Sequence, residues 1–256
     1  MDKLVDNYQL FLLILARMIG FVFMNPFFGK SNVFSLIRVG IAGILSFTVF
    51  FNFDVTENLS NGVLVFGLMF CLEFFWGFLL SFVVDLVLSA IIFGGELFDM
   101  QMGLSMSKFY DPSSGAELPT TGALIRVLFM ITFFLTSSHV HLIDIIIKSY
   151  QALPIGKWPG LGAFSYILTL NKDVLTMGLK MAMPMIAAVS IMDIGIGVLM
   201  RTVPQLNVFV LNIYIKFVVG FLLLLKLSPS FIGFSHMLAD KMFLGMENLL
   251  ALAVKV

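Results

Sequence analysis

Six long apolar segments dominate the sequence, and each has about the 20 residues that a helix needs to cross a bilayer. Polar breaks that contain Pro, Gly or Asn separate them. We expect helices over Tyr8–Phe28, Val33–Phe51, Val63–Phe93, Ala123–Ile147, Val174–Met200 and Leu206–Leu227. The pattern therefore predicts an all-α, polytopic protein of the membrane type, built from helical hairpins.

Three stretches leave their local structure open. Val63–Phe93 would reach about 46 Å as one helix at about 1.5 Å per residue. It is therefore either one long tilted helix or two helices bent near Gly77. Phe231–Val254 is more amphipathic, and we expect it to lie on a surface or to pack in a hairpin, without spanning. Pro184 is expected to kink the helix that contains it.

The composition supports a membrane environment or a large assembly. Hydrophobic residues make up 60% of the 256 residues and charged residues 12%, against about half and a quarter in an ordinary soluble domain. The excess apolar surface must face lipid or other subunits. A formal net charge of zero gives no basic patch for nucleic acid. Asp2, Asp6 and Arg17 make the first apolar segment unlike a cleaved signal, so we expect a retained helix.

Ionisable residues lie inside nearly every apolar segment. The eight residues are Arg17, Arg38, Glu73, Asp85, Arg126, Lys180, Asp193 and Lys216. Each would cost at least about 2.5–3.5 kcal/mol at a helix centre that faces lipid. Their signs nearly cancel, so we expect charge pairing between helices or between subunits. An ion path is the alternative, but no segment carries the acidic cluster or histidine relay that such a path suggests.

Motifs of catalysis or metal binding are weak. His139 and His141 are two residues apart and would point in different directions on a helix. Gly195 and Gly197 lack the third glycine of a dinucleotide-binding loop and read better as small residues at a helix contact. No nucleophile elbow, P-loop or zincin motif occurs in the sequence. We therefore predict no catalytic, cofactor-binding or metal-binding residues, and no enzyme.

The segment Gly94–Ser107 differs from the apolar segments because it combines acidic residues, methionines and glycines. Glu96, Asp99 and Gly103 share one helical face, and Met102 and Met106 lie one turn apart. A loop rich in Ser and Gly follows. Because methionine side chains adapt to irregular and changing neighbours, this combination suits a surface that reshapes itself.

This segment also carries a family resemblance. The residues that form the signature are Gly95, Glu96, Asp99, Gln101, Met102, Gly103, Leu104 and Ser105, followed by Asp111 and Pro112. They resemble the central signature of the FliR family, export-gate components of flagellar type III secretion whose injectisome relatives are the SctT proteins. Leu153–Gly156 and Met200–Val210 resemble two further landmarks of the family. The three landmarks occur in order and cover almost the whole chain, although Tyr214 stands where many relatives have Pro.

The resemblance implies an architecture and a set of partners. A FliP-like helical part would cover residues 1–174, and a FliQ-like helical hairpin would cover residues 175–256. One copy would join FliP and FliQ homologues in a helical hetero-oligomeric pore, with FlhB and FlhA homologues as further partners. That pore would pass unfolded flagellar substrates beyond the bacterial inner membrane, at the flagellar basal body, in contact with membrane lipid.

The resemblance also implies residue roles. A plug loop over about 105–122 would close the resting pore, and its gate residues would be Met102, Met106, Phe109, Tyr110, Asp111, Pro112 and Gly115. The hairpin turn and its assembly contacts would involve Arg201, Pro204, Gln205 and Asn207. No cofactor is implied.

Two alternatives remain open from the sequence. An SctT-type injectisome subunit would share the same landmarks. A secondary transporter would explain charges inside the apolar segments and the proline in the fifth of them, but the chain has no repeated pair of interrupted helices.

Overall fold

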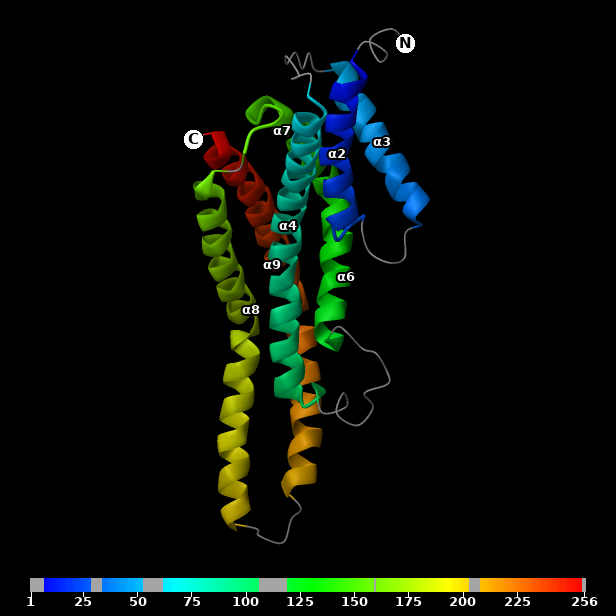
Figure 1. Cartoon of the computed structure of the whole chain (residues 1–256). Helices are drawn as coiled ribbons and strands as arrows, with labels where there is room; N and C mark the ends of the chain where they lie inside the picture. The colour runs from blue at the N-terminus through cyan, green and yellow to red at the C-terminus, as the bar shows by residue number, and fades with distance from the viewer. Residues whose placement is uncertain are drawn as a thin grey trace. The chain divides into compact units, whose positions relative to one another are not determined.

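A computed structural model of the chain describes residues 7–28, 34–52, 62–105, 119–158, 160–202 and 208–254. Within these ranges all regular structure is helical (Figure 1). The helices are α2 (Tyr8–Met24), α3 (Ser35–Asn52), α4 (Val63–Met102), α6 (Thr120–Leu135), α7 (Ser138–Ala152), α8 (Leu161–Thr202) and α9 (Val208–Val254). The all-α prediction is confirmed.

Three of these helices are long and apolar enough to cross a membrane: α4, residues Gly162–Thr202 of α8, and residues Leu211–Ala253 of α9. The helices α6 and α7 taken together are also long and apolar enough to cross a membrane, but the pair is bent by 74° at the break between them. α2 and α3 are shorter apolar helices. The membrane-type prediction therefore holds, with three candidate spans or four if the bent pair forms one.

The structure chooses one long helix over two in the third apolar segment. α4 has 40 residues and continues through Gly77 to Met102. Gly77 is buried, and a side chain in its place would collide with the backbone carbonyl of Arg17. The glycine therefore serves the contact between α4 and α2, and that packing offsets its low helix propensity.

Several other expected boundaries are wrong. α8 begins at Leu161, well before the expected Val174. Ala123–Ile147 is not one helix, because α6 ends at Leu135 and α7 begins at Ser138. The turn between them has Ser137 at a positive φ of 55°, which a continuing helix cannot accommodate.

The expected break before Phe231 does not occur, since α9 is one helix of 47 residues through Pro229. The proline ring lies on the exposed side of α9, while Phe231 and Ser235 are buried next to it. Their burial offsets the one backbone hydrogen bond that proline removes. The stretch Phe231–Val254 is thus a continuation of a longer helix. α8 likewise is assigned as one helix through Pro184.

The chain forms two compact units, and each has its own packing. The first contains Met1–Val87, His139–Leu170 and Lys241–Val256, and the second contains Leu88–Ser138 and Asn171–Asp240. The helices α4, α8 and α9 each contribute residues to both units.

The first unit is built around close contact between α2 and the first half of α4. Gly20 and Gly77 let the two backbones approach, because a Cβ at either glycine would collide with backbone atoms of the other helix. On the other side of α2, the ring of Phe11 lies 5.1 Å from that of Phe47 in α3. Trp76 is fully buried and donates a hydrogen bond from Nε1 to the carbonyl oxygen of Lys157, at 2.8 Å. The tryptophan thereby ties the segment after α7 to α4.

In the second unit, methionine side chains pack against glycines. A side chain at Gly94 would collide with Met181, and one at Gly220 would collide with Met102 and Met185. These thioether side chains fill the space that the glycines leave between α4, α8 and α9. Within this unit the residues of α8 and α9 before and after 203–207 run antiparallel, since Asp193 pairs with Lys216 and Met185 lies next to Gly220.

The antiparallel parts of α8 and α9 expose much apolar surface. Ile191 and Ile194 of α8 are 72% and 70% exposed, and Leu222 and Leu225 of α9 are both 59% exposed. Only 17% of the most apolar stretch of α8 and 11% of that of α9 is buried. A surface of this kind needs lipid or another subunit to cover it.

The contact between α2 and α4 yields a stability prediction. Gly77→Ala should lower the free energy of unfolding by about 1–3 kcal/mol, because the added Cβ overpacks the contact with Arg17 and Phe21. Gly67→Ala is the matched control in the same helix, since nothing lies within 4 Å of its added Cβ. That variant should be neutral or slightly stabilising. Thermal unfolding of the detergent-purified protein measures both, and equal melting temperatures would contradict the packing role of Gly77.

Candidate functional site

The end of α4 is defined by Gly103. Its φ of +79° is in the left-handed region, which glycine adopts without steric cost. The N–H of Leu104 donates to the carbonyl oxygen of Asp99 at 2.9 Å, and the N–H of Gly103 donates to that of Met100 at 3.2 Å. This pair of hydrogen bonds is the Schellman termination of a helix. Gly103 therefore determines where the chain leaves α4.

The beginning of α6 is capped by a side chain from α4. Asp99 is 1% exposed, and its carboxylate accepts hydrogen bonds from the backbone N–H groups of Thr120 at 2.6 Å and Thr121 at 3.1 Å. The first N–H groups of a helix have no partner within the helix and favour a negative charge. The N-cap residue, Pro119, forms no side-chain cap of its own. Asp99 thus supplies from another helix the cap that α6 lacks.

A glycine contact holds the same two helices together one turn earlier. A side chain at Gly95 would collide with the backbone of Gly122. Gly95 and Asp99 are four residues apart and so lie on one face of α4, toward α6. We call Gly95, Asp99, Gly103, Thr120 and Gly122 the loop base, because they join the two helices on either side of residues 106–118.

Met102 lies in the packed interior beside the loop base. It is 2% exposed, and together with Met185 it lies over Gly220 of α9. Two other residues of the signature, Glu96 and Gln101, are half-buried on α4. The signature thus combines residues that end α4, residues that join it to α6, and a methionine that packs against α9.

Several predicted residues lie outside the described part of the chain. For the plug these are Met106, Phe109, Tyr110, Asp111, Pro112 and Gly115, and for the hairpin turn they are Pro204, Gln205 and Asn207. Arg201 is exposed in the last turn of α8. One boundary needs correction, because residues 120–122 form the first turn of α6 and are not part of a loop. Asp99 stabilises that turn by capping it.

A buried ion pair lies in the first unit. Arg17 of α2 and Glu73 of α4 are both fully buried, with 2.7 Å between Nε and Oε2. The other carboxylate oxygen of Glu73 accepts the N–H of Gly156 at 2.9 Å. Arg17 also donates to Ser149 Oγ at 3.3 Å and to the carbonyl oxygen of Leu153 at 3.2 Å. Buried charges are tolerated when they are paired and hydrogen-bonded in this way.

The sequence did not reveal most of the partners of this pair. The guanidinium carbon of Arg17 lies 4.1 Å from the ring centroid of Tyr150, whose hydroxyl donates to the carbonyl oxygen of Ile14 at 3.0 Å. Gly156 has a φ of +82°, and its N–H donates a hydrogen bond to the carboxylate of Glu73. The only sequence signal was the landmark Leu153–Gly156, because both of its ends belong to this network.

The other predicted charges differ in their surroundings. Lys216 and Asp193 form an ion pair at 2.8 Å that is partly exposed, at 21% and 43%. Arg38 of α3 and Arg126 of α6 are half-buried, while Asp85 and Lys180 are exposed on the chain by itself. Among these eight residues, the structure thus pairs Arg17 with Glu73 and Asp193 with Lys216.

The comparison with known proteins decides the family. Residues 8–242 match the family described as bacterial export proteins, family 1. The chain belongs to this family. The FliR protein of Bacillus subtilis, a flagellar biosynthetic protein, is 29% identical over 229 residues, which cover 88% of each chain. The FliR protein of Escherichia coli is 27% identical over 243 residues, covering 93% of this chain and 89% of that one.

A relative outside the flagellar proteins also matches. The surface presentation of antigens protein SpaR of Shigella flexneri is 25% identical over 215 residues, covering 82% of this chain and 83% of SpaR. The resemblance to the FliR family is thus confirmed over most of the length. The chain is an export protein of the FliR/SpaR family, with candidate membrane helices, and not an enzyme.

The cap on α6 can be tested in this FliR-family protein. Asp99→Ala should cost about 1–2 kcal/mol of stability, because it leaves the N–H groups of Thr120 and Thr121 without their acceptor. Asp99→Asn keeps one acceptor oxygen and should cost less. Amide hydrogen exchange in the first turn of α6 should become faster in both variants, and more so in Asp99→Ala than in Asp99→Asn. Unchanged exchange in Asp99→Ala would show that the cap does not stabilise the loop base.

The buried ion pair gives a larger effect. Glu73→Gln leaves the charge of Arg17 buried without a counter-ion and should lower the free energy of unfolding by about 3–5 kcal/mol. Asp144→Asn is the control, because Asp144 and Lys148 form an exposed ion pair of α7 at 2.6 Å, worth less than about 1 kcal/mol. Denaturant unfolding in detergent measures both variants. If Glu73→Gln and Asp144→Asn lowered the free energy of unfolding by similar amounts, the buried pair would have no special role in stability.

Proposed function

We propose that this FliR-family chain is a subunit of the flagellar type III export gate and forms the export pore with FliP and FliQ homologues. The pore would pass unfolded flagellar substrates beyond the inner membrane, with FlhB and FlhA homologues nearby. The single observation that carries the proposal is the family match over residues 8–242, with flagellar FliR proteins among the relatives.

The loop base supports a plug role for the residues it flanks. Residues 106–118 begin after the Schellman end of α4 and finish at the capped start of α6, so both ends are held by α4. Anchored ends restrict where a segment can go, which lowers the entropic cost of placing it in a pore. Met106, Phe109 and Tyr110 would then form a deformable apolar seal that opposes ions without selecting among polypeptide sequences.

The exposed helices support assembly with other subunits. In the proposal, residues 1–174 are the FliP-like part and residues 175–256 the FliQ-like hairpin, whose turn includes Arg201, Pro204, Gln205 and Asn207. The most apolar stretches of α8 and α9 are largely exposed in the single chain, as expected for helices that contact partner subunits or lipid. Half-buried Arg126 is a candidate for a charge pair with one of those subunits.

An injectisome subunit is the second candidate, and the match to SpaR supports it. The flagellar relatives range from 21% to 29% identity, and SpaR, at 25%, falls within that range. The highest of these identities are with flagellar FliR proteins, which favours the flagellar system. Family membership argues against a secondary transporter. To separate the two systems, the chain is expressed in one strain that lacks its FliR protein and in another that lacks its SctT protein. Restored swimming of the first strain supports the flagellar system, and restored host-cell injection by the second supports the injectisome.

Replacement of the proposed plug tests the mechanism. Residues 107–118 are exchanged for a Gly/Ser segment of equal length, in the chain co-expressed with the FliP and FliQ homologues of the same genome. The complex should assemble but leak, because Phe109 and Tyr110 no longer obstruct the pore. Conductance in planar bilayers and dye release from proteoliposomes should rise at least about tenfold, which corresponds to a loss of about 1.4 kcal/mol from the barrier.

The matched control exchanges residues 53–60, which join α3 to α4, for a Gly/Ser segment of equal length. This complex should stay as tight as the wild type. An assembled complex with the altered 107–118 segment and unchanged permeability would refute the plug. If that complex did not assemble, the double variant Phe109→Ala, Tyr110→Ala provides the same measurement with a smaller change.

A further inference from the structure

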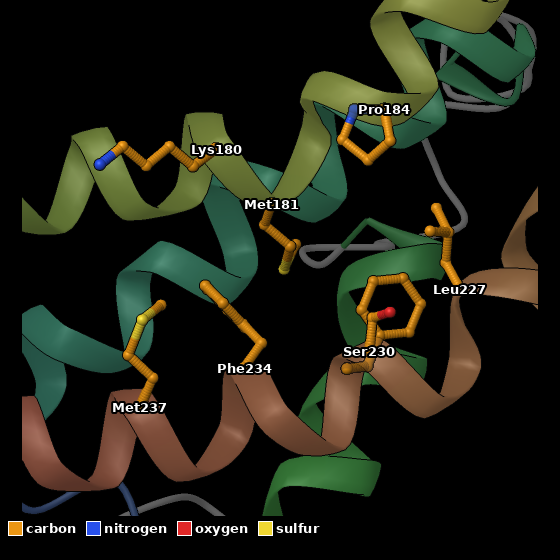
Figure 2. A pocket seen from close by; sticks show the side chains of 8 residues that line it. Lys180, Met181, Pro184, Leu227, Ser230, Phe234 and Met237 are labelled. Carbon is orange, nitrogen blue, oxygen red and sulfur yellow. The ribbon is translucent and has the colours of Figure 1, made fainter.

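A pocket lies between α8 and α9 within the second unit. Its volume is about 310 Å³. Apolar side chains from both helices line it, namely Met181, Pro184, Leu227, Phe231, Phe234 and Met237 (Figure 2). Pro184 and Ser230 are short side chains and leave space between the longer ones. The wall chemistry therefore suits a flexible apolar ligand.

The pocket lies at one end of a long apolar run. In α8 this run extends from Met181 to Met200, which at about 1.5 Å per residue is about 30 Å and matches the hydrocarbon core of a bilayer. Its one acid, Asp193, is paired with Lys216. In α9 the antiparallel apolar run ends at Leu225, before Lys226. Lys180 and Lys226 thus mark the same end of both runs, where lysines meet lipid headgroups.

Lys180 supplies a positive charge at the edge of this pocket. Its side chain extends along α8 away from Pro184, so that the ammonium group lies on the far side of Met181 from the apolar run (Figure 2). Lys180 is exposed and has no ion pair or side-chain hydrogen bond to any residue that the structure describes. An apolar slot with a cation at its outer end complements a ligand with an apolar tail and an anionic head.

We propose that this pocket binds one acyl chain of an anionic phospholipid, with the lipid phosphate next to Lys180. A volume near the lower end of the about 300–1,000 Å³ typical of ligand pockets suits part of one chain better than a whole lipid. The charge of Lys180 selects an anionic head over a zwitterionic one. This site is independent of the plug and adds a lipid ligand to the proposed export gate.

Native mass spectrometry of the full-length chain in detergent tests the proposal. The protein is titrated with phosphatidylglycerol and phosphatidylcholine of identical acyl chains. We expect about a fivefold preference for phosphatidylglycerol, the usual effect of one lysine near an anionic lipid surface. Lys180→Gln should abolish the preference, Lys180→Arg should keep it, and Lys172→Gln should leave it unchanged as the control on the same helix.

Two further arms separate this lipid from other occupants. Ser230→Leu fills the pocket and should reduce binding of both lipids at least about threefold, and a photoreactive acyl chain should label residues 181–184 or 227–237. Inorganic phosphate at equal concentration should not compete. Full competition by phosphate would show that Lys180 belongs to a simple anion site. Labelling of residues outside these ranges would show that the acyl chain does not bind in the pocket, as expected if a partner helix occupies it. Either result overturns the proposal. These readouts need neither pore formation nor export, so their failure is distinct from failure of the proposed function.

Discussion

The buried pair of Arg17 and Glu73 is the constraint on which the first unit depends. A charge inside an apolar unit is expensive unless opposite charge and hydrogen-bond partners surround it. The guanidinium and carboxylate therefore recruit groups from α7 and from the segment after it, including Ser149 and the N–H of Gly156. Around the pair, Gly77 lets α2 and α4 approach closely enough for the two charges to meet. Electrostatics and close packing thus enforce the same arrangement.

The second unit solves a different problem with similar means. It joins α4 and α6 on either side of residues 106–118, while many residues of α8 and α9 are exposed. Asp99 joins the end of α4 to the start of α6, because a helix N-terminus lacks internal acceptors and attracts a carboxylate. Methionines such as Met102 and Met185 fill the spaces over glycines. The result is a well-anchored loop base next to methionine side chains, whose flexible thioethers can repack against changing neighbours.

The apolar surface of α8 and α9 connects this architecture with its surroundings. A chain that leaves so much of two long helices uncovered is incomplete by itself. Subunits of the export apparatus could cover one part of this surface and lipid another. The pocket beside Lys180 is the part that we propose for lipid. Buried Arg17 and Glu73 pair inside the chain, and Asp193 and Lys216 form a second pair that is partly exposed.

The sequence alone determined the features that depend on local order. Hydrophobic runs predicted helices, glycine and proline predicted most breaks, and the signature around Asp99 and Gly103 predicted the family, because helix length, turn chemistry and motif spacing are local properties. Only the tertiary structure decided that Arg17 pairs with Glu73, that α6 begins at Thr120 under the carboxylate of Asp99, and that α9 continues past Pro229. These outcomes depend on distances between helices far apart in the chain, and such distances are not contained in hydrophobic periodicity.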